Sequence, residues 1–204
     1  MTTTQRKCTA FEGFERIASG DLTTVAAVAK TVLERGEKAP VLIFDDQTGE
    51  QVDLDFRGSV DDVLRRIASQ VSLTANESDE ANADEPRGRG RPKLGVVARE
   101  VTLLPRHWEW LSTQPGGASV AIRKLVEDAR RAHRGKDIAR QAQEAAYRFL
   151  SALAGNLPEF EEATRALFAN DAKRFSKLTA KWPAAVRDHS LKFANAAFEA
   201  NQSA

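Results

Sequence analysis

Four basic residues stand close together in the heptapeptide RGRGRPK, which runs from Arg87 to Lys93. Neighbouring bases are separated by a single residue, Gly88, Gly90 or Pro92. Cationic side chains at this spacing favour contact with a polyanion, because each neutralised phosphate releases bound counterions. The segment is therefore predicted to bind a polyanion, and its charge allows nucleic acid, a membrane surface or an acidic protein.

This heptapeptide resembles the core of an AT-hook, an extended peptide that lies in the minor groove of AT-rich DNA. The resemblance implies that the two central arginines enter the groove, where A-tracts concentrate negative potential, while the outer two bases touch phosphate. Glycine would let the backbone lie flat, and proline would extend it. The DNA-contact residues implied here are Arg87, Arg89, Gly90, Arg91, Pro92 and Lys93. A solubilising basic linker that pairs with the preceding acids is the alternative.

The sequence REVTLLPRHWEWLSTQPGGASVAIRKLVEDA resembles a ribbon-helix-helix module. The matching features are a Leu-Pro pair after a short strand, a glycine turn, and a second helix that opens with Ser and Ile-Arg, here Leu104-Pro105, Gly116-Gly117, Ser119 and Ile122-Arg123. The resemblance implies a homodimer whose paired strands enter the major groove, with a helix N-terminus facing a phosphate. It adds as DNA-contact candidates Arg99, Thr102, Arg106 and Ser119.

The strand of this segment departs from the ribbon pattern. Counting back from Pro105, two of the three groove-facing positions are apolar, Val101 and Leu103, and a shift by one residue does not improve the match. A strand-helix-helix that belongs to a larger core is therefore the alternative interpretation. If the segment does bind DNA, specificity is expected from the hook and from phosphate contacts.

Most of the chain also resembles an uncharacterised bacterial protein family. The stretches that carry this likeness are FDDQTGEQVDLDFRG, GRPKLGVVAREVTLLPRHWEWL, QPGGASVAIRKLV and RDHSLKFA. The resemblance implies one type of bacterial cytoplasmic protein, and it brings no established activity, substrate or catalytic residue.

The charge of the chain is unevenly distributed. Residues 77–85 carry five acids and no base, and residues 86–134 carry eleven bases against four acids, although the whole chain has a net charge of only +1. A basic segment inside a nearly neutral chain says more about binding partners than the total does. DNA, AT-rich in the first place, is the predicted partner.

The elements that would position these residues predict an α+β fold with a small N-terminal β-α-β-β-α domain at residues 1–73. Residues 7–14 form a first strand, and apolar spacing predicts a helix over 21–36, opened by Asp21 and closed by Gly36. Two β-rich runs around DQTGE predict a hairpin over 40–56. A second helix follows with Ser59 as N-cap.

Residues 74–95 read as a linker that is acidic and then basic. It has almost no large apolar residue, so disorder is expected unless a partner holds it. Residues 96–204 form the third part, a strand-helix-helix followed by a helical bundle. The strand candidate ends at Pro105, and helices are expected over 106–114, 118–135 and 136–155. Three more are expected over 158–169, 170–182 and 183–200, the first and last of which begin at a proline.

No catalytic constellation is visible, so the chain is predicted to be non-enzymatic, without cofactor or metal. Its three histidines lack ligand spacing and are expected on helix surfaces, and the aspartates at 45, 46, 53 and 55 read as the wet face of a hairpin. The single cysteine, Cys8, excludes an internal disulfide. No apolar run has the length of a membrane span, and no secretory signal is seen, so a cytoplasmic protein is expected. A protein-interaction adaptor is the alternative function.

Overall fold

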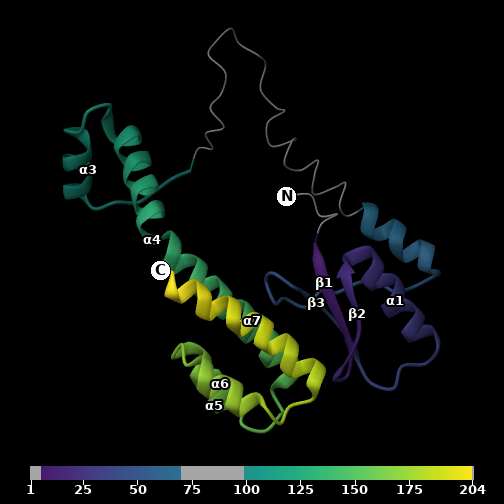
Figure 1. Cartoon of the computed structure of the whole chain (residues 1–204). Helices are drawn as coiled ribbons and strands as arrows, with labels where there is room; N and C mark the ends of the chain where they lie inside the picture. The colour runs from purple at the N-terminus through teal and green to yellow at the C-terminus, as the bar shows by residue number, and fades with distance from the viewer. Residues whose placement is uncertain (1–5, 70–98, 204) are drawn as a thin grey trace. The chain divides into compact units, whose positions relative to one another are not determined.

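The computed structural model of the chain describes residues 6–69 and 99–203 (Figure 1). The predicted hook residues from Arg87 to Lys93, and the predicted linker at 74–95, lie outside the described residues. The described chain forms two compact units. We call residues 6–69 with 135–203 the large unit, and residues 99–134 the small unit.

A three-stranded antiparallel sheet forms the N-terminal part of the large unit. Its order is β2-β1-β3, with the strands β1 (Lys7–Glu12), β2 (Glu15–Asp21) and β3 (Val41–Asp45). The first strand predicted over residues 7–14 is confirmed as β1, but it ends at Glu12, because a hairpin turn at Gly13, with φ +57°, leads into β2, which the sequence did not predict. β2 is an edge strand without a fully buried side chain, so it lacks the apolar signal of β1.

The hairpin predicted over residues 40–56 is only half formed. β3 is confirmed, but beyond the turn the chain makes one bridge, Phe44 to Gln51, and one further bond from Val52 N–H to the Ile43 carbonyl. The predicted alternation still holds, since Val52, Leu54 and Phe56 are half-buried against the core while Asp53 and Asp55 are exposed. An extended segment lying on a core produces the same sequence pattern as a paired strand.

The two faces of the sheet belong to two apolar clusters. Cys8, Ala10 and Ile43 pack with α1 (Leu22–Glu34) and with the helix over residues 60–69. Phe11 and Phe44 directly follow Ala10 and Ile43 in their strands, so they face the other way and belong to the cluster built by the C-terminal helices. Successive side chains of a strand point to opposite faces, so a sheet only three strands wide joins two cores.

The C-terminal part is helical, as predicted, and the mixed fold class is confirmed. Its elements are α3 (Pro105–Ser112), α4 (Gly117–Phe149), the π-helix η2 (Leu150–Ala154), α5 (Phe160–Phe168), α6 (Ala172–Thr179) and α7 (Ala184–Gln202). The two helices predicted over 118–135 and 136–155 are one continuous helix, because Gly135 does not interrupt it. Glycine disfavours a helix interior by only about 1 kcal/mol, which neighbouring residues can offset.

One core unites the N-terminal sheet with the last helices. Phe11 and Phe44 lie against Phe149, with ring centroids 5.7 and 5.0 Å from that of Phe149, and the Phe193 ring lies 5.5 Å from it. The sheet and the helices after residue 134 thus share one unit, whereas the sequence reading assigned residues 1–73 and 96–204 to separate domains. Phe168 of α5 does not belong to this core, since 49% of it is exposed.

Candidate nucleic-acid interface

The small unit begins with α3, whose start follows directly from the Leu-Pro pair. Proline suits the first helical position because it has no N–H to satisfy and its φ is already helical. Leu104 precedes the helix in extended conformation, and its carbonyl accepts hydrogen bonds from the N–H groups of His107 and Trp108. The predicted helix is therefore confirmed within two residues of its expected bounds.

A glycine turn connects α3 to α4, as the sequence predicted. Gly116 and Gly117 both have positive φ, +84° and +76°, a conformation that residues with a Cβ rarely adopt. The N–H of Gly117 donates to the Gln114 carbonyl, which closes the turn. A helix-turn-helix hairpin is thus encoded by residue types that the turn geometry requires.

The strand predicted before α3 is not formed. Residues 99–104, the described part of the predicted strand, have no strand pairing in the single chain. A β-strand is held by hydrogen bonds to a neighbouring strand, and no strand of the described chain pairs with this segment. A ribbon would therefore require a strand from outside the described residues.

The four described candidates from the sequence lie on the surface. Arg99, Thr102, Arg106 and Ser119 are all exposed, and no hydrogen bond among the described residues joins any two of them. Ser119 lies in the first turn of α4, where backbone N–H groups lack helical partners, and its own carbonyl accepts the Nε of Arg123 at 3.0 Å. The structure brings these residues into one unit without assembling them into a single site.

The sequence analysis missed a row of cations on α4. At about 100° per residue, the side chains of Arg123, Arg130, Arg131 and Arg134 fall on one half of the helix circumference. Glu127 accepts hydrogen bonds from Arg130 at 2.9 Å and Arg131 at 3.3 Å, and the Arg130 bond lowers the pKa of this glutamate below its ordinary value. Helical spacing in the stretch KLVEDARRAHRG was the signal that could have revealed this basic face.

The small unit differs from the large unit in how its arginines are paired. In residues 6–69 and 135–203, ten of eleven arginines form a salt bridge, and Arg16 is the exception. In residues 99–134 only two of six do so, Arg130 and Arg131. Within the described chain, the small unit therefore carries most of the guanidinium groups that are free to meet an external anion.

Both tryptophans of α3 are exposed. Trp108 is 43% and Trp110 50% accessible, and Leu111 is the buried residue of this helix. The third tryptophan, Trp182, is buried in the large unit, where its Nε1 donates to the Pro158 carbonyl at 2.7 Å. Exposed aromatic rings beside free cations suit the binding of either nucleic acid or protein.

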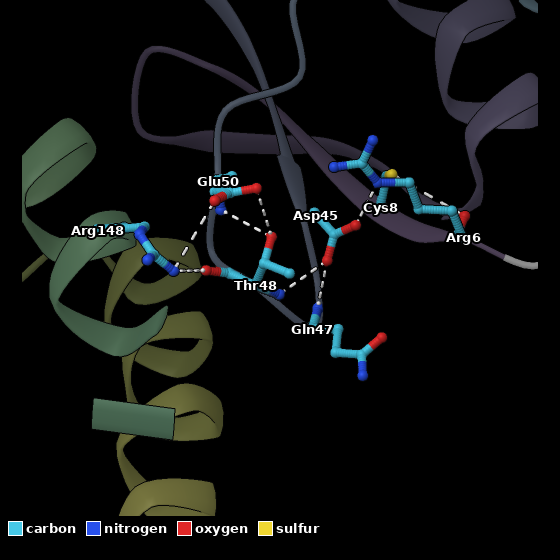
Figure 2. Close-up of polar contacts among 7 residues, drawn as sticks. All are labelled: Arg6, Cys8, Asp45, Gln47, Thr48, Glu50 and Arg148. Carbon is cyan, nitrogen blue, oxygen red and sulfur yellow. Dashed lines mark hydrogen bonds and ion pairs between the residues drawn. The ribbon is translucent and has the colours of Figure 1, made fainter. Parts of the chain in front are cut away.

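A second polar cluster surrounds the turn after β3, and Figure 2 shows its contacts. The carboxylate of Asp45 accepts the N–H groups of Gln47 and Thr48, at 2.7 and 2.8 Å, and the Nε of Arg6. Burial alone would raise the pKa of Asp45, but these three donors together lower it. Arg148 of α4 donates to the Thr48 carbonyl at 3.0 Å (Figure 2), so the turn is fastened to the helix.

The neighbouring aspartate joins the sheet to α7. Asp46 accepts the hydroxyl of Thr9 and the Nζ of Lys192, both at 2.7 Å, and lies 3.6 Å from Nε2 of His189. Contrary to the expectation of a surface histidine, His189 is buried among Phe11 and Phe149, and its Nε2 has no hydrogen-bond partner. Burial lowers the pKa of His189 to about 4, and Asp46 opposes that shift.

The residues of this second cluster have a structural role. Its cations and carboxylates neutralise one another, in the pairs Arg6–Asp45 and Lys192–Asp46. Within residues 6–69 and 99–203, no group of three or more His, Cys, Asp or Glu side chains could hold a metal ion. Burial also raises the pKa of the nearby Cys8 thiol to about 11, which keeps it in the unreactive protonated form at neutral pH.

Comparison with known proteins identifies the family of the chain. The family described as "Uncharacterized protein conserved in bacteria (DUF2239)" matches residues 7–194, a range that includes all the described strands, the small unit and the large unit as far as Ala194. No curated protein and no solved structure matches the chain. No helix in the described part of the chain is long and apolar enough to cross a membrane. The chain belongs to this uncharacterised family of conserved bacterial proteins.

Proposed function

We propose that this protein is a non-enzymatic, cytoplasmic DNA-binding protein that contacts nucleic acid through residues 86–134. The basic side chains of the hook sequence and the cations of the small unit supply the affinity for DNA. The function is regulatory or serves nucleoid organisation, and the protein acts as a homodimer. AT-rich duplex is the preferred partner, since arginine is attracted to a narrow minor groove.

The observation that carries the proposal is the set of unpaired guanidinium groups in the small unit. Arg99, Arg106, Arg123 and Arg134 are exposed and form no ion pair with a described residue. An unpaired surface arginine can bind phosphate without first losing an acidic partner, and its planar fork matches two phosphate oxygens. These residues follow directly on RGRGRPK in the sequence, so both sets of cations lie within 48 residues.

Salt-dependent binding to duplex DNA tests this function. Fluorescence anisotropy with a labelled AT-rich duplex is measured at 50 and 200 mM salt, and affinity is expected to fall at least about tenfold between them. Replacement of the four basic residues of the hook sequence by alanine, as R87A/R89A/R91A/K93A, is expected to remove most of the binding to DNA.

The matched control changes four lysines that are also exposed and unpaired in the described chain, as K136A/K173A/K177A/K181A in the large unit. Because both variants lose four positive charges, an effect of total charge alone would weaken them equally. Retained binding in the hook variant would refute the role of RGRGRPK. Absence of binding by the unaltered protein, even at 50 mM salt, would refute the DNA-binding function itself.

A protein-interaction adaptor remains the second candidate, because the small unit also exposes large apolar side chains. Capture of protein partners after nuclease treatment separates the two candidates. An adaptor retains its partner at high salt without nucleic acid, whereas a DNA-binding protein loses partners that were bridged by DNA.

A further inference from the structure

The small unit has a hydrophobic core that is only partly covered. Within residues 99–134, the buried apolar side chains are Leu111 of α3 and Ala121 of α4. Trp108 stands one turn before Leu111 and is 43% exposed, and Leu125 stands one turn after Ala121 and is 50% exposed. Residues four apart, or three apart, share a helix face. On each helix the buried apolar position is therefore followed directly by exposed apolar surface.

Further apolar residues extend this surface. Leu104, four residues before Trp108, is 49% exposed, and Val126 is 60% exposed. On α4, Ile122, Leu125, Val126 and Ala129 follow the spacing i, i+3, i+4, i+7 of an amphipathic helix. We name this surface the apolar seam, and its members are Leu104, Trp108, Ile122, Leu125, Val126 and Ala129.

We propose that the apolar seam is the contact surface for a second copy of this chain. The inference extends the homodimer part of the proposed function and rests on that part, while its test needs no DNA. Among the described residues of the small unit, the buried apolar side chains are only Leu111 and Ala121, and a unit with so small a core needs oligomerisation or another support. Every molecule of this protein is accompanied by other copies of the same chain. A second copy is therefore always available to cover the exposed apolar surface of the small unit.

The size of the seam suits a dimer. Four large side chains that are half exposed offer roughly 100 Å² each, so two copies together bury roughly 800 Å² of apolar surface. Apolar atoms make up about 60% of a typical interface, so a contact centred on the seam reaches roughly 1,300 Å². That area lies within the range of about 1,200–2,000 Å² found for specific, stable interfaces.

The positions of the arginines on α4 allow two like-charged copies to meet at the apolar seam. Around the helix, at about 100° per residue, Arg131 and Arg134 are turned away from Ile122, Val126 and Ala129 by about 80° or more, and Arg123 by about 60° or more. Arg130 lies about 40° from Val126, and its charge is paired with Glu127. A second copy on the seam therefore brings apolar faces together and leaves Arg123, Arg131 and Arg134 at the outside. Two-fold symmetry repeats the same patch on both chains, so each seam covers the other.

The test measures the mass of the full-length protein without DNA, by light scattering after size exclusion and by sedimentation. We expect twice the single-chain mass of 22.4 kDa at micromolar concentration. Leu125→Glu is expected to give a single chain. Ile138→Glu is the matched control, because Ile138 lies on the same helix with 48% exposure and faces away from the seam. It is expected to remain a dimer.

A disulfide cross-link tests the same interface independently, in case Leu125→Glu unfolds the small unit. The one native thiol, Cys8, is fully buried, so Val126→Cys introduces a single accessible thiol. Under mild oxidation Val126→Cys is expected to form a disulfide dimer, and Ile138→Cys is expected to stay uncrosslinked. A single chain at all concentrations, or a dimer that Leu125→Glu leaves intact, would overturn the proposal. Loss of DNA binding by a protein that still dimerises would overturn only the proposed function.

Discussion

At the scale of single residues, His189 is unusual because it is a titratable side chain that is buried. It is a titratable group enclosed by phenylalanine rings, and its unpartnered Nε2 faces Asp46 from 3.6 Å. The charged groups that act on it are Asp46, which favours the protonated form, and Lys192 and Arg16, which oppose it. Burial dominates, so the folded protein holds this imidazole neutral at neutral pH.

This burial predicts a loss of stability in mild acid. The pKa of His189 is lowered from its ordinary 6.5 to about 4, so the unfolded chain binds a proton in a range where the folded chain does not. Stability from this residue is complete above pH 6.5 and is lost as the pH falls toward 4, by up to about 3 kcal/mol in total. Urea unfolding at pH 7 and pH 5 should show the difference.

The variant His189→Leu is expected to be less sensitive to the same change in pH, because it removes the proton-binding group and keeps an apolar side chain among the rings. His133→Leu serves as its control, since His133 is exposed on α4. Equal pH sensitivity of the native protein and His189→Leu would show that other groups account for the acid effect.

At the scale of elements, the helix over residues 60–69 shows how a predicted cap is realised. Its Ser59 Oγ accepts the N–H of Asp62 at 3.2 Å, and the Asp62 carboxylate accepts the Ser59 N–H at 2.9 Å. This is a reciprocal capping box, in which each side chain satisfies a backbone donor of the other residue. The hydrogen bond from Ser59 also lowers the pKa of Asp62.

The capping box predicts coupled losses of stability. Ser59→Ala is expected to cost about 1 kcal/mol, in line with other N-cap replacements. Adding Asp62→Ala to it should cost less than the sum of the two single changes, because the two residues act as a pair. Asp61→Ala, an exposed neighbour without a hydrogen bond in the described chain, should be nearly neutral. Denaturation monitored by circular dichroism measures all four proteins, and strictly additive losses would contradict the pairing.

The elements also show what the sequence could and could not predict. Apolar spacing and Pro and Gly signals correctly placed α1, α3, α5, α6 and α7, whereas Gly135 was wrongly taken as the end of a helix inside α4. β2 was missed because its side chains are only half-buried at best, and the second hairpin strand was wrong because the turn anchored by Asp45 is followed by unpaired chain. The cluster of Asp46 and Lys192 spans 146 residues of sequence, and no local pattern signals such a contact. The hook residues, outside the described chain, stay a prediction.

At the scale of the whole molecule, the two units differ strongly in how much they bury. The large unit has an extended core around Phe149, whereas the buried apolar side chains of the small unit are Leu111 and Ala121. Units with few buried apolar contacts open at lower free energy than well-packed ones. The small unit should therefore unfold first.

Tryptophan fluorescence can follow each unit separately. In W108F/W110F only Trp182 reports, from the core of the large unit, while W182F leaves the two reporters of α3. The α3 signal is expected to change at lower urea than the Trp182 signal, and its midpoint should rise with protein concentration if the small unit is held by a second copy. Coincident transitions that do not depend on concentration would indicate that the protein unfolds as one block.

The rings of Phe11, Phe149 and Phe193 have a consequence for how this protein is made. The ribosome delivers the first strand more than 180 residues before the last of these three rings. The face of the nascent sheet that carries Phe11 therefore stays incompletely covered until Phe193 has been synthesised. Truncation of α7 should for this reason expose β1 and β3 to aggregation or chaperone capture, although α7 begins more than 170 residues after β1 in the sequence.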